Sequence, residues 1–253
     1  MVYISIPLDD LDSHIEDKLK KRTMRYSIYE GSFGVFSSVL SENTIIPFAL
    51  SINSSPFQIG LLTSLGNFIS PLGQIIGSNQ IEKKSRKSIL ILGTVGQLCI
   101  WPLFIVIALL NQVILFQSFL TWMLIVSFLI YMLFGGIMTP PWFSVMGDVV
   151  PDGYRGRYFA KRNLINQIIA ITGTILLFFL LDWFNINKKI YFGFTLLFIL
   201  GLLTRLVSIF LFTKHYYPHF DFKPLDHIKM NHFLKKISKS NFGKFTLFVC
   251  LLI

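Results

Sequence analysis

Two carboxylates and one guanidinium lie inside long apolar stretches of this sequence. Glu30 and Glu42 fall within one stretch, and Arg205 falls within another. Ionisable side chains at membrane depth are costly, and they usually face a cavity or a charged partner. Glu42 is about 16 residues into its stretch, roughly 24 Å along a helix axis, and Pro47 follows about one turn later. We therefore expect Glu42 to face a cavity or a partner. The alternatives are a protonated carboxyl hydrogen-bonded inside a helix bundle and a stretch that ends earlier.

Glu30 and Arg205 also have simpler explanations. Glu30 is nearer the start of its stretch, where a helix N-terminus stabilises an acidic side chain. Arg205 is near the inner end of its stretch, and its long side chain can reach the membrane surface. Solute binding is the alternative for Glu30, and pairing with a buried carboxylate is the alternative for Arg205.

Other polar or aromatic side chains in these stretches can contact a solute or can join helices. Amides serve either purpose, because they hydrogen-bond equally well to a ligand and to a neighbouring helix. A tryptophan beside two prolines forms either a cavity wall or packing at a helix kink. The candidates of this kind are Asn43, Asn67, Gln74, Asn166 and Trp142, and Asn43 is grouped with Glu42.

These residues are carried by six apolar stretches. The chain is 53% hydrophobic and 14% charged, whereas soluble domains carry about a quarter charged residues. A helix of about 20 residues crosses the roughly 30 Å hydrocarbon core. The expected spans are approximately 26–52, 57–80, 88–110, 118–150, 164–184 and 190–213. Gly73 and Gly77 in the second span predict a close contact between helices.

Four segments are expected from this pattern. Residues 1–25 form an amphipathic segment at the cytosolic surface, and 26–213 form an all-α bundle of six transmembrane helices. Residues 214–241 form an amphipathic cytosolic linker. Residues 242–253 are the truncated start of a seventh span, because this stretch is too short to cross a bilayer.

The basic residues predict the orientation. Of 23 Lys and Arg, 20 lie in the N-terminal segment and in every second loop after it. Two (Lys188 and Lys189) lie in the other loops, and Arg205 lies within a span. Basic loops stay in the cytosol, so the N-terminus is expected there. This placement explains the net charge of +10, so the basic excess does not indicate nucleic-acid binding. The compact basic loops favour a prokaryotic plasma membrane.

Two loops resemble signatures of the major facilitator superfamily. In IEKKSRK (81–87), Glu82, Lys83, Arg86 and Lys87 take the acidic and basic places, although Ser85 replaces a glycine and Gly77 is one residue out of register. The second signature lies in the loop between the fourth and fifth spans, where an acid and a proline precede Arg-Gly. Here these residues are Asp148, Pro151, Arg155 and Gly156. The resemblance covers residues 1–253.

The resemblance implies the N-terminal six-helix half, built as a 3+3 repeat, of a transporter that works by alternating access. It implies that Glu42 and Asn43 line the cavity and contact the solute or a proton. It also implies a cytosolic gate, in which Asp148 meets Arg86 or Lys83 and Arg155 or Arg157 contributes; Glu82 belongs to the same group. The alternative is that these basic residues only set the orientation and bind anionic lipids. Tyr131 stands where proton-linked members often have arginine, and Gly173 alone represents a glycine-rich drug-antiporter motif, so proton antiport of drugs is not supported.

We therefore expect a secondary transporter for a small solute, without a cofactor or metal. Its expected partners are membrane lipids, the solute, a coupling proton or ion, and the missing C-terminal half. A membrane-embedded enzyme and a non-transporting scaffold are the competing functions. The four histidines between residues 215 and 232 are expected in a solvated loop, because Pro218 interrupts the first pair.

Overall fold

The computed structural model describes residues 8–111, 117–218, 240, 241, 243–245 and 248. The chain divides into one unit that ends at Pro218 and a second that begins at His219. The regular elements of the described residues are helices. All the helices discussed below belong to the first unit.

Six helices are long and apolar enough to cross a membrane. This confirms the six predicted spans and the all-α fold. A single 3₁₀ turn, η2 (Asp152–Tyr154), joins the fourth and fifth of them. The helices are α1 (Leu8–Ser51), α2 (Pro56–Ile81), α3 (Arg86–Leu110), α4 (Gln117–Val149), α5 (Arg155–Ile186) and α6 (Ile190–Thr213).

Two helices begin earlier than the apolar stretches do. α1 runs without a break through the N-terminal segment and the first span, because ion pairs at i,i+4 spacing continue the helix: Glu16 with Lys20 and Asp17 with Lys21, each at 2.8 Å. α5 starts at Arg155 instead of near residue 164, since its first turns are polar and hydropathy alone cannot detect them. Most of the predicted linker, 214–241, lies outside the described residues, as does most of 242–253.

Local signals fix the helix boundaries between the spans. Ser55 caps α2: its hydroxyl accepts from the Gln58 amide at 3.3 Å, and its own amide donates to the Gln58 side chain at 2.9 Å. Pro56 occupies the first turn, where no amide donor is needed. Ser85 caps α3 through the amide of Ser88 at 3.2 Å. The short turns between helices are therefore encoded locally.

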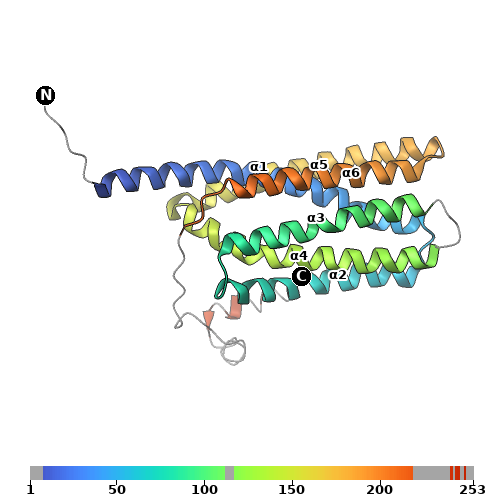
Figure 1. The fold of residues 1–253 in the computed structure, drawn as a ribbon, viewed down its shortest axis with the longest axis horizontal. Helices are drawn as coiled ribbons and strands as arrows, with labels where there is room; N and C mark the ends of the chain where they lie inside the picture. The colour runs from blue at the N-terminus through green and yellow to red at the C-terminus, as the bar shows by residue number, and fades with distance from the viewer. Residues whose placement is uncertain (1–7, 112–116, 219–239, 242, 246–247, 249–253) are drawn as a thin grey trace. The chain divides into compact units, whose positions relative to one another are not determined.

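The six helices form two groups of three, which lie side by side in Figure 1. One group is α1, α5 and α6, and the other is α2, α3 and α4; α3 packs against α6 and joins them. α2 and α4 approach very closely, because a Cβ on Gly73 would lie 3.0 Å from the Cα of Gly136. The close contact predicted for Gly73 and Gly77 is thus confirmed. Trp101, Phe104, Tyr131 and Phe198 fill the interior where the two groups meet.

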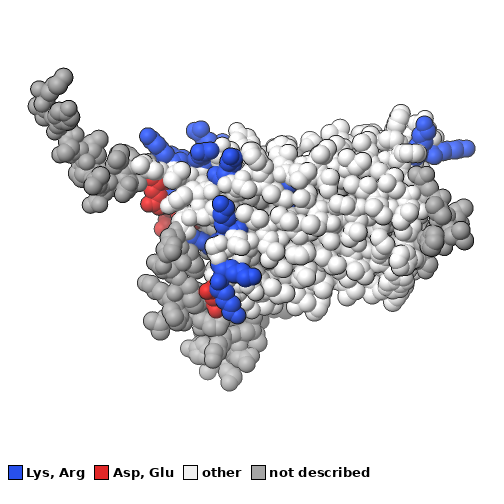
Figure 2. Space-filling view, viewed as in Figure 1, with Lys and Arg blue, Asp and Glu red and all other residues white. Residues whose placement is uncertain are grey.

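In the face that Figure 2 shows, charged side chains gather at the two ends of the helices, and almost none is visible on the surface between them. One end carries the end of α4, the start of α5 and the start of α3, and we call it the basic end. The opposite end carries Lys188 and Lys189. This distribution fits helices that cross the apolar core of a bilayer.

Candidate functional site

The predicted solute-binding residues separate into an exposed set and a buried set. Glu42, Asn43, Asn67 and Gln74 are exposed. Glu30, Trp142, Asn166 and Arg205 are buried, with exposed fractions of 2–9%. The two sets therefore occupy different environments, and they are described in turn.

One side of α1 is uncovered over the half of the helix nearer the opposite end. Ser41, Thr44, Ile45, Phe48 and Ala49 point into the bundle and are buried. Glu42, Asn43, Ile46, Pro47 and Leu50 are exposed. We call these five residues the uncovered face of α1. Its polar members, Glu42 and Asn43, are about 100° apart around the helix, so they point toward different neighbours.

Glu42 points toward α2 and α4. It lines a small cavity of about 180 Å³ together with Thr63, Asn67 and Phe128. The structure thus brings Glu42 and Asn67 to one cavity. Gln74 lies two turns beyond Asn67 on α2 and is also exposed, on the same side of that helix.

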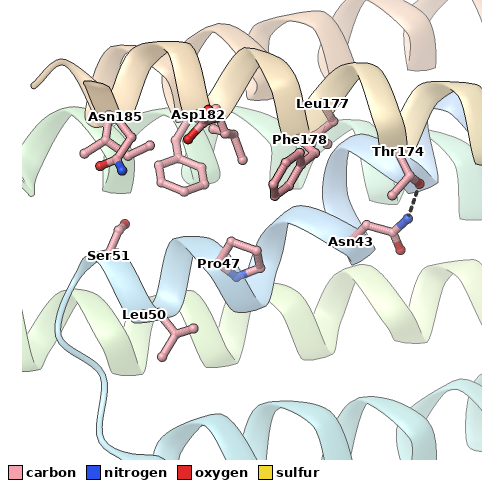
Figure 3. A pocket seen from close by; sticks show the side chains of 12 residues that line it. Asn43, Pro47, Leu50, Ser51, Thr174, Leu177, Phe178, Asp182 and Asn185 are labelled. Atoms are coloured by element: carbon pink, nitrogen blue, oxygen red, sulfur yellow. Dashed lines mark hydrogen bonds between the residues drawn. The ribbon is translucent and has the colours of Figure 1, made fainter. Parts of the chain in front are cut away.

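Asn43 points toward α5 and lines a larger pocket of about 590 Å³. Its side-chain amide donates to the hydroxyl of Thr174 at 2.9 Å and joins α1 to α5 at one end of the pocket (Figure 3). Asp182 and Asn185 line the same pocket. Sequence reasoning missed these α5 residues, although Thr174, Phe178, Asp182 and Asn185 recur at the three- to four-residue spacing of one helical face.

Glu30 is buried in the other half of α1 and forms an ion pair. One of its carboxylate oxygens lies 3.6 Å from the guanidinium of Arg162 on α5, and both side chains are at least 87% buried. The Arg162 guanidinium also lies 4.2 Å from the ring centre of Trp142 and donates to the Ser27 carbonyl at 3.2 Å. Glu30 is therefore not the interfacial acid that we expected, because α1 starts well before it and places it inside the bundle.

Arg205 completes this group from α6. Its exposed fraction is 2%, so its side chain does not reach the membrane surface as expected. The Arg205 guanidinium, the Glu30 carboxylate and the Ser208 hydroxyl all lie within 4 Å of the place that a Cβ on Gly34 would take. We call Glu30, Trp142, Arg162 and Arg205 the buried charge cluster.

The buried charge cluster includes a close approach to a glycine that sequence reasoning overlooked. A Cβ on Gly31 would lie 2.5 Å from the Arg162 guanidinium, so Arg162 in this position needs a residue without a side chain there. A Cβ on Gly34 would make only ordinary contacts with Glu30, Arg205 and Ser208, at 3.4–3.9 Å. Asn166 is buried one turn after Arg162 and extends the polar side of α5. A cavity of about 120 Å³, lined by Glu30, Trp142, Arg162 and others, lies beside the cluster.

His215 is buried near the cluster, at the basic end. It was expected in a solvated loop, but its exposed fraction is 6%, and its ring packs against Phe212 and Tyr217 with centroid distances of 5.4 and 6.3 Å. Burial is the main cause that lowers the pKa of His215 to about 4; a backbone hydrogen bond with Tyr26 acts in the opposite direction, and the charge of Arg162 also lowers the pKa. The imidazole is therefore neutral at pH 7. The other three histidines lie outside the described residues.

The cytosolic charges meet at the basic end. Arg86, at the start of α3, is 4% exposed and pairs with Asp148 near the end of α4 at 2.5 Å. It also donates to the Ser144 hydroxyl at 3.0 Å and to the Pro218 carbonyl at 2.7 Å. The structure thus brings Arg86 and Asp148 together, as the resemblance implies, and it adds the chain that follows α6.

The remaining residues of the expected gate are placed differently. Arg155 donates to the Gly147 and Val150 carbonyls at the end of α4 and pairs with Asp152 at 2.8 Å, so it caps that helix end. Glu82, Lys83 and Arg157 are exposed. Of the four basic residues expected near Asp148, Arg86 is the one that contacts it.

Comparison with known proteins gives a family. The sequence model of the Major Facilitator Superfamily matches residues 31–253. No curated protein and no solved structure matches the chain.

Proposed function

Because the chain belongs to the major facilitator superfamily, whose members are membrane transporters, we propose that it moves a small solute by alternating access as a secondary transporter. The observation that carries this proposal is the uncovered face of α1. A polar stripe with a carboxylate, an amide and a kinking proline is exposed on a membrane-spanning helix between two cavities. Such a face is costly toward lipid and useful toward a solute.

Glu42, Asn43 and Asn67 are the proposed contacts of the solute or of a coupling ion, and Gln74 extends the same polar path along α2. Glu42 is the proposed proton carrier, since its carboxyl is the ionisable group of the uncovered face. In this proposal a second six-helix half covers the face, and the solute binds between the two halves.

Arg86 and Asp148 are the proposed gate at the basic end. Their ion pair joins the start of α3 to the end of α4, and Asp148 remains 42% exposed. Asp148 is partly exposed and rehydrates at little cost when the pair separates, and Arg86 has the Ser144 hydroxyl and the Pro218 carbonyl as its other acceptors. Such a pair suits a contact that forms in one state and breaks in another. Asp148→Lys is expected to change the transport rate without preventing membrane insertion, and a wild-type rate would contradict the gate.

We place the protein in the plasma membrane with its N-terminus in the cytosol. The support is the concentration of Lys and Arg at the basic end, which follows the usual orientation rule. A reporter fused to the N-terminus, assayed for accessibility in sealed cells, tests this orientation.

The test of transport uses the full-length protein in proteoliposomes that contain a pH-sensitive dye. Pools of solutes are screened for solute-driven proton movement, with wild type compared with Glu42→Gln. The matched control is Glu16→Gln, a carboxylate near the start of α1 that is about half exposed; this variant is expected to behave as wild type. Proton flux that is lost only in Glu42→Gln supports coupling through Glu42.

Two other results are informative. Equal proton flux in wild type and Glu42→Gln would make Glu42 a structural carboxyl and leave transport standing. If no pool gives proton flux, exchange of labelled solute across the same vesicles decides between uncoupled transport and none. Absence of exchange with every pool would contradict the proposed function and favour a scaffold.

A further inference from the structure

The larger pocket beside the uncovered face of α1 has the chemistry of a site for an organic cation. It lies between α1, α5 and the start of α6 and has a volume of about 590 Å³, which is within the range of small-molecule sites. Figure 3 shows Asn43 and Thr174 at one end of the pocket, Ser51 and Asn185 at the other, and Phe178 and Asp182 projecting from α5 toward Pro47. Two helices thus present polar groups to a mostly apolar pocket.

The charge of the pocket is negative. Asp182 is its one ionisable residue among the described residues that line it. The Asp182 side chain is exposed, and it forms no ion pair or hydrogen bond with another described residue. A lone carboxylate beside apolar walls attracts a cation more strongly than it would in water and repels an anion. Electrostatics therefore selects the sign of the occupant.

The aromatic ring favours a bulky cation over a small metal ion. Phe178 lies one turn before Asp182 on the same side of α5, and its exposed fraction is 66%. The face of a phenyl ring attracts ammonium groups, including those that carry methyl groups and cannot donate hydrogen bonds. Leu177, Leu181 and Phe194 supply the apolar floor. An ion that keeps its water shell gains little from such a surface, whereas an alkyl ammonium buries apolar area.

The proline in α1 adds an acceptor. Pro47 has no amide proton, so the carbonyl of Asn43, four residues earlier, loses its helical donor. Both Asn43 and Pro47 line the pocket. The Asn43 side chain uses its NH₂ group on Thr174 and keeps its carbonyl oxygen as an acceptor. The polar groups of α1 at this pocket are therefore suited to accept hydrogen bonds from an ammonium.

We propose that this pocket binds an organic amine or quaternary ammonium, with Asp182 as its counter-ion, Phe178 as its aromatic wall and Asn43 as an acceptor. The proposal rests on the proposed transport function, because it names the class of solute. It concerns residues of α5 that are separate from the Glu42 cavity. It predicts a charge selectivity that depends on Asp182 and not on Glu42.

The experiment measures binding to the full-length protein in nanodiscs of phosphatidylcholine, which carry no net charge. The probes are tetraphenylphosphonium and tetraphenylborate, which have nearly the same shape and opposite charge, and protein-free nanodiscs give the background. We expect saturable binding of the cation alone, displaced by tetraethylammonium. Asp182→Asn should weaken cation binding at least tenfold, and Phe178→Leu should weaken it two- to fivefold. Glu16→Gln is the control and should bind as wild type.

Equal binding of both probes, or unchanged cation binding in Asp182→Asn, would overturn the cation site. These outcomes are distinguishable from failure of the transport proposal. Exchange of labelled neutral or anionic solutes, without saturable binding of the cation, would keep the transporter and remove the cation site. Cation binding that depends on Asp182, without exchange of any labelled solute, would keep the site and remove the transport function.

Discussion

Glu30 and Glu42 lie on the same helix, twelve residues apart, but Glu30 is buried in the bundle and Glu42 is exposed. The twelve residues rotate the second side chain by about 120° relative to the first. Glu30 therefore points into the bundle, where Arg162 pairs with it and Arg205 lies nearby. Glu42 points out of the bundle, beside cavities that contain amides and hydroxyls. A carboxylate at membrane depth can thus hold helices together or can be available to a solute. The direction in which the side chain points from its helix decides between these roles.

The two carboxylates also differ in what neutralises their charge. In the buried charge cluster, arginines from α5 and α6 compensate Glu30 within the unit. On the uncovered face, no described Lys or Arg lines the Glu42 cavity or the Asp182 pocket. We infer that the first region contributes mainly to stability and that the second contributes mainly to binding.

The largest expected difference concerns Arg162. Arg162→Ala leaves the Glu30 carboxylate buried beside Arg205 alone and removes the contact with Trp142. Breaking a buried ion pair on one side costs about 3 kcal/mol, so the thermal unfolding midpoint of the purified protein should fall clearly. Glu42→Ala, on the uncovered face, should change the free energy of unfolding by less than about 0.5 kcal/mol.

Two further variants sharpen this comparison. Arg157→Ala removes an exposed arginine five residues earlier in α5 and is the matched control, with little expected change. Glu30→Leu combined with Arg162→Leu should cost less than Arg162→Ala, because no unpaired charge stays buried. If Arg162→Ala and Arg157→Ala melted alike, the buried charge cluster would not stabilise the bundle.

A second difference concerns pH. The folded-state pKa of His215 is about 4, below the ordinary value of about 6.5. The unfolded state therefore binds more protons between these values, and stability is present above about pH 6.5 and is lost as the pH falls toward 4. Between pH 7.5 and pH 5 this loss is about 2 kcal/mol.

Thermal unfolding at the two pH values measures the effect of His215. His215→Phe keeps an aromatic ring in the same apolar surroundings and cannot take up a proton. Its unfolding midpoint should fall less than that of wild type when the pH is lowered. The same fall in both proteins would mean that His215 is solvated or that other groups dominate the acid response.

The sequence predicted the spans better than it predicted the sites, for physical reasons. Apolar stretches mark membrane helices, and the distribution of Lys and Arg gives their alternation, so the six helices were found. The contact of Arg86 with Asp148 followed from the resemblance of two loops to two signatures of one family. Arg162 was counted as a loop residue, because hydropathy indicates where a span becomes apolar. It does not indicate where the helix begins.

The sequence also left open the direction in which each polar side chain points from its helix. Glu30 and Glu42 are both acids within one apolar stretch, and only the packing of α1 against α5 and α6 decides which of them is buried. Asp182 was overlooked, since an acid near the end of a span resembles an interfacial residue until its pocket is seen. Gly31 held usable information, because a residue without a side chain makes room for Arg162.

The smallest expected difference concerns the hydrogen bond between Asn43 and Thr174 on the uncovered face. Both side chains are accessible to solvent, so water replaces either partner when the other is removed, and the pair should couple by no more than about 1 kcal/mol. Asn43→Leu, Thr174→Val and the double variant form a double-mutant cycle, read by thermal unfolding. The same cycle with Glu30→Gln and Arg162→Gln should give a larger coupling. Equal couplings would mean that the two halves of α1 hold the bundle together to the same extent, and that the division between a stabilising region and a binding region is wrong.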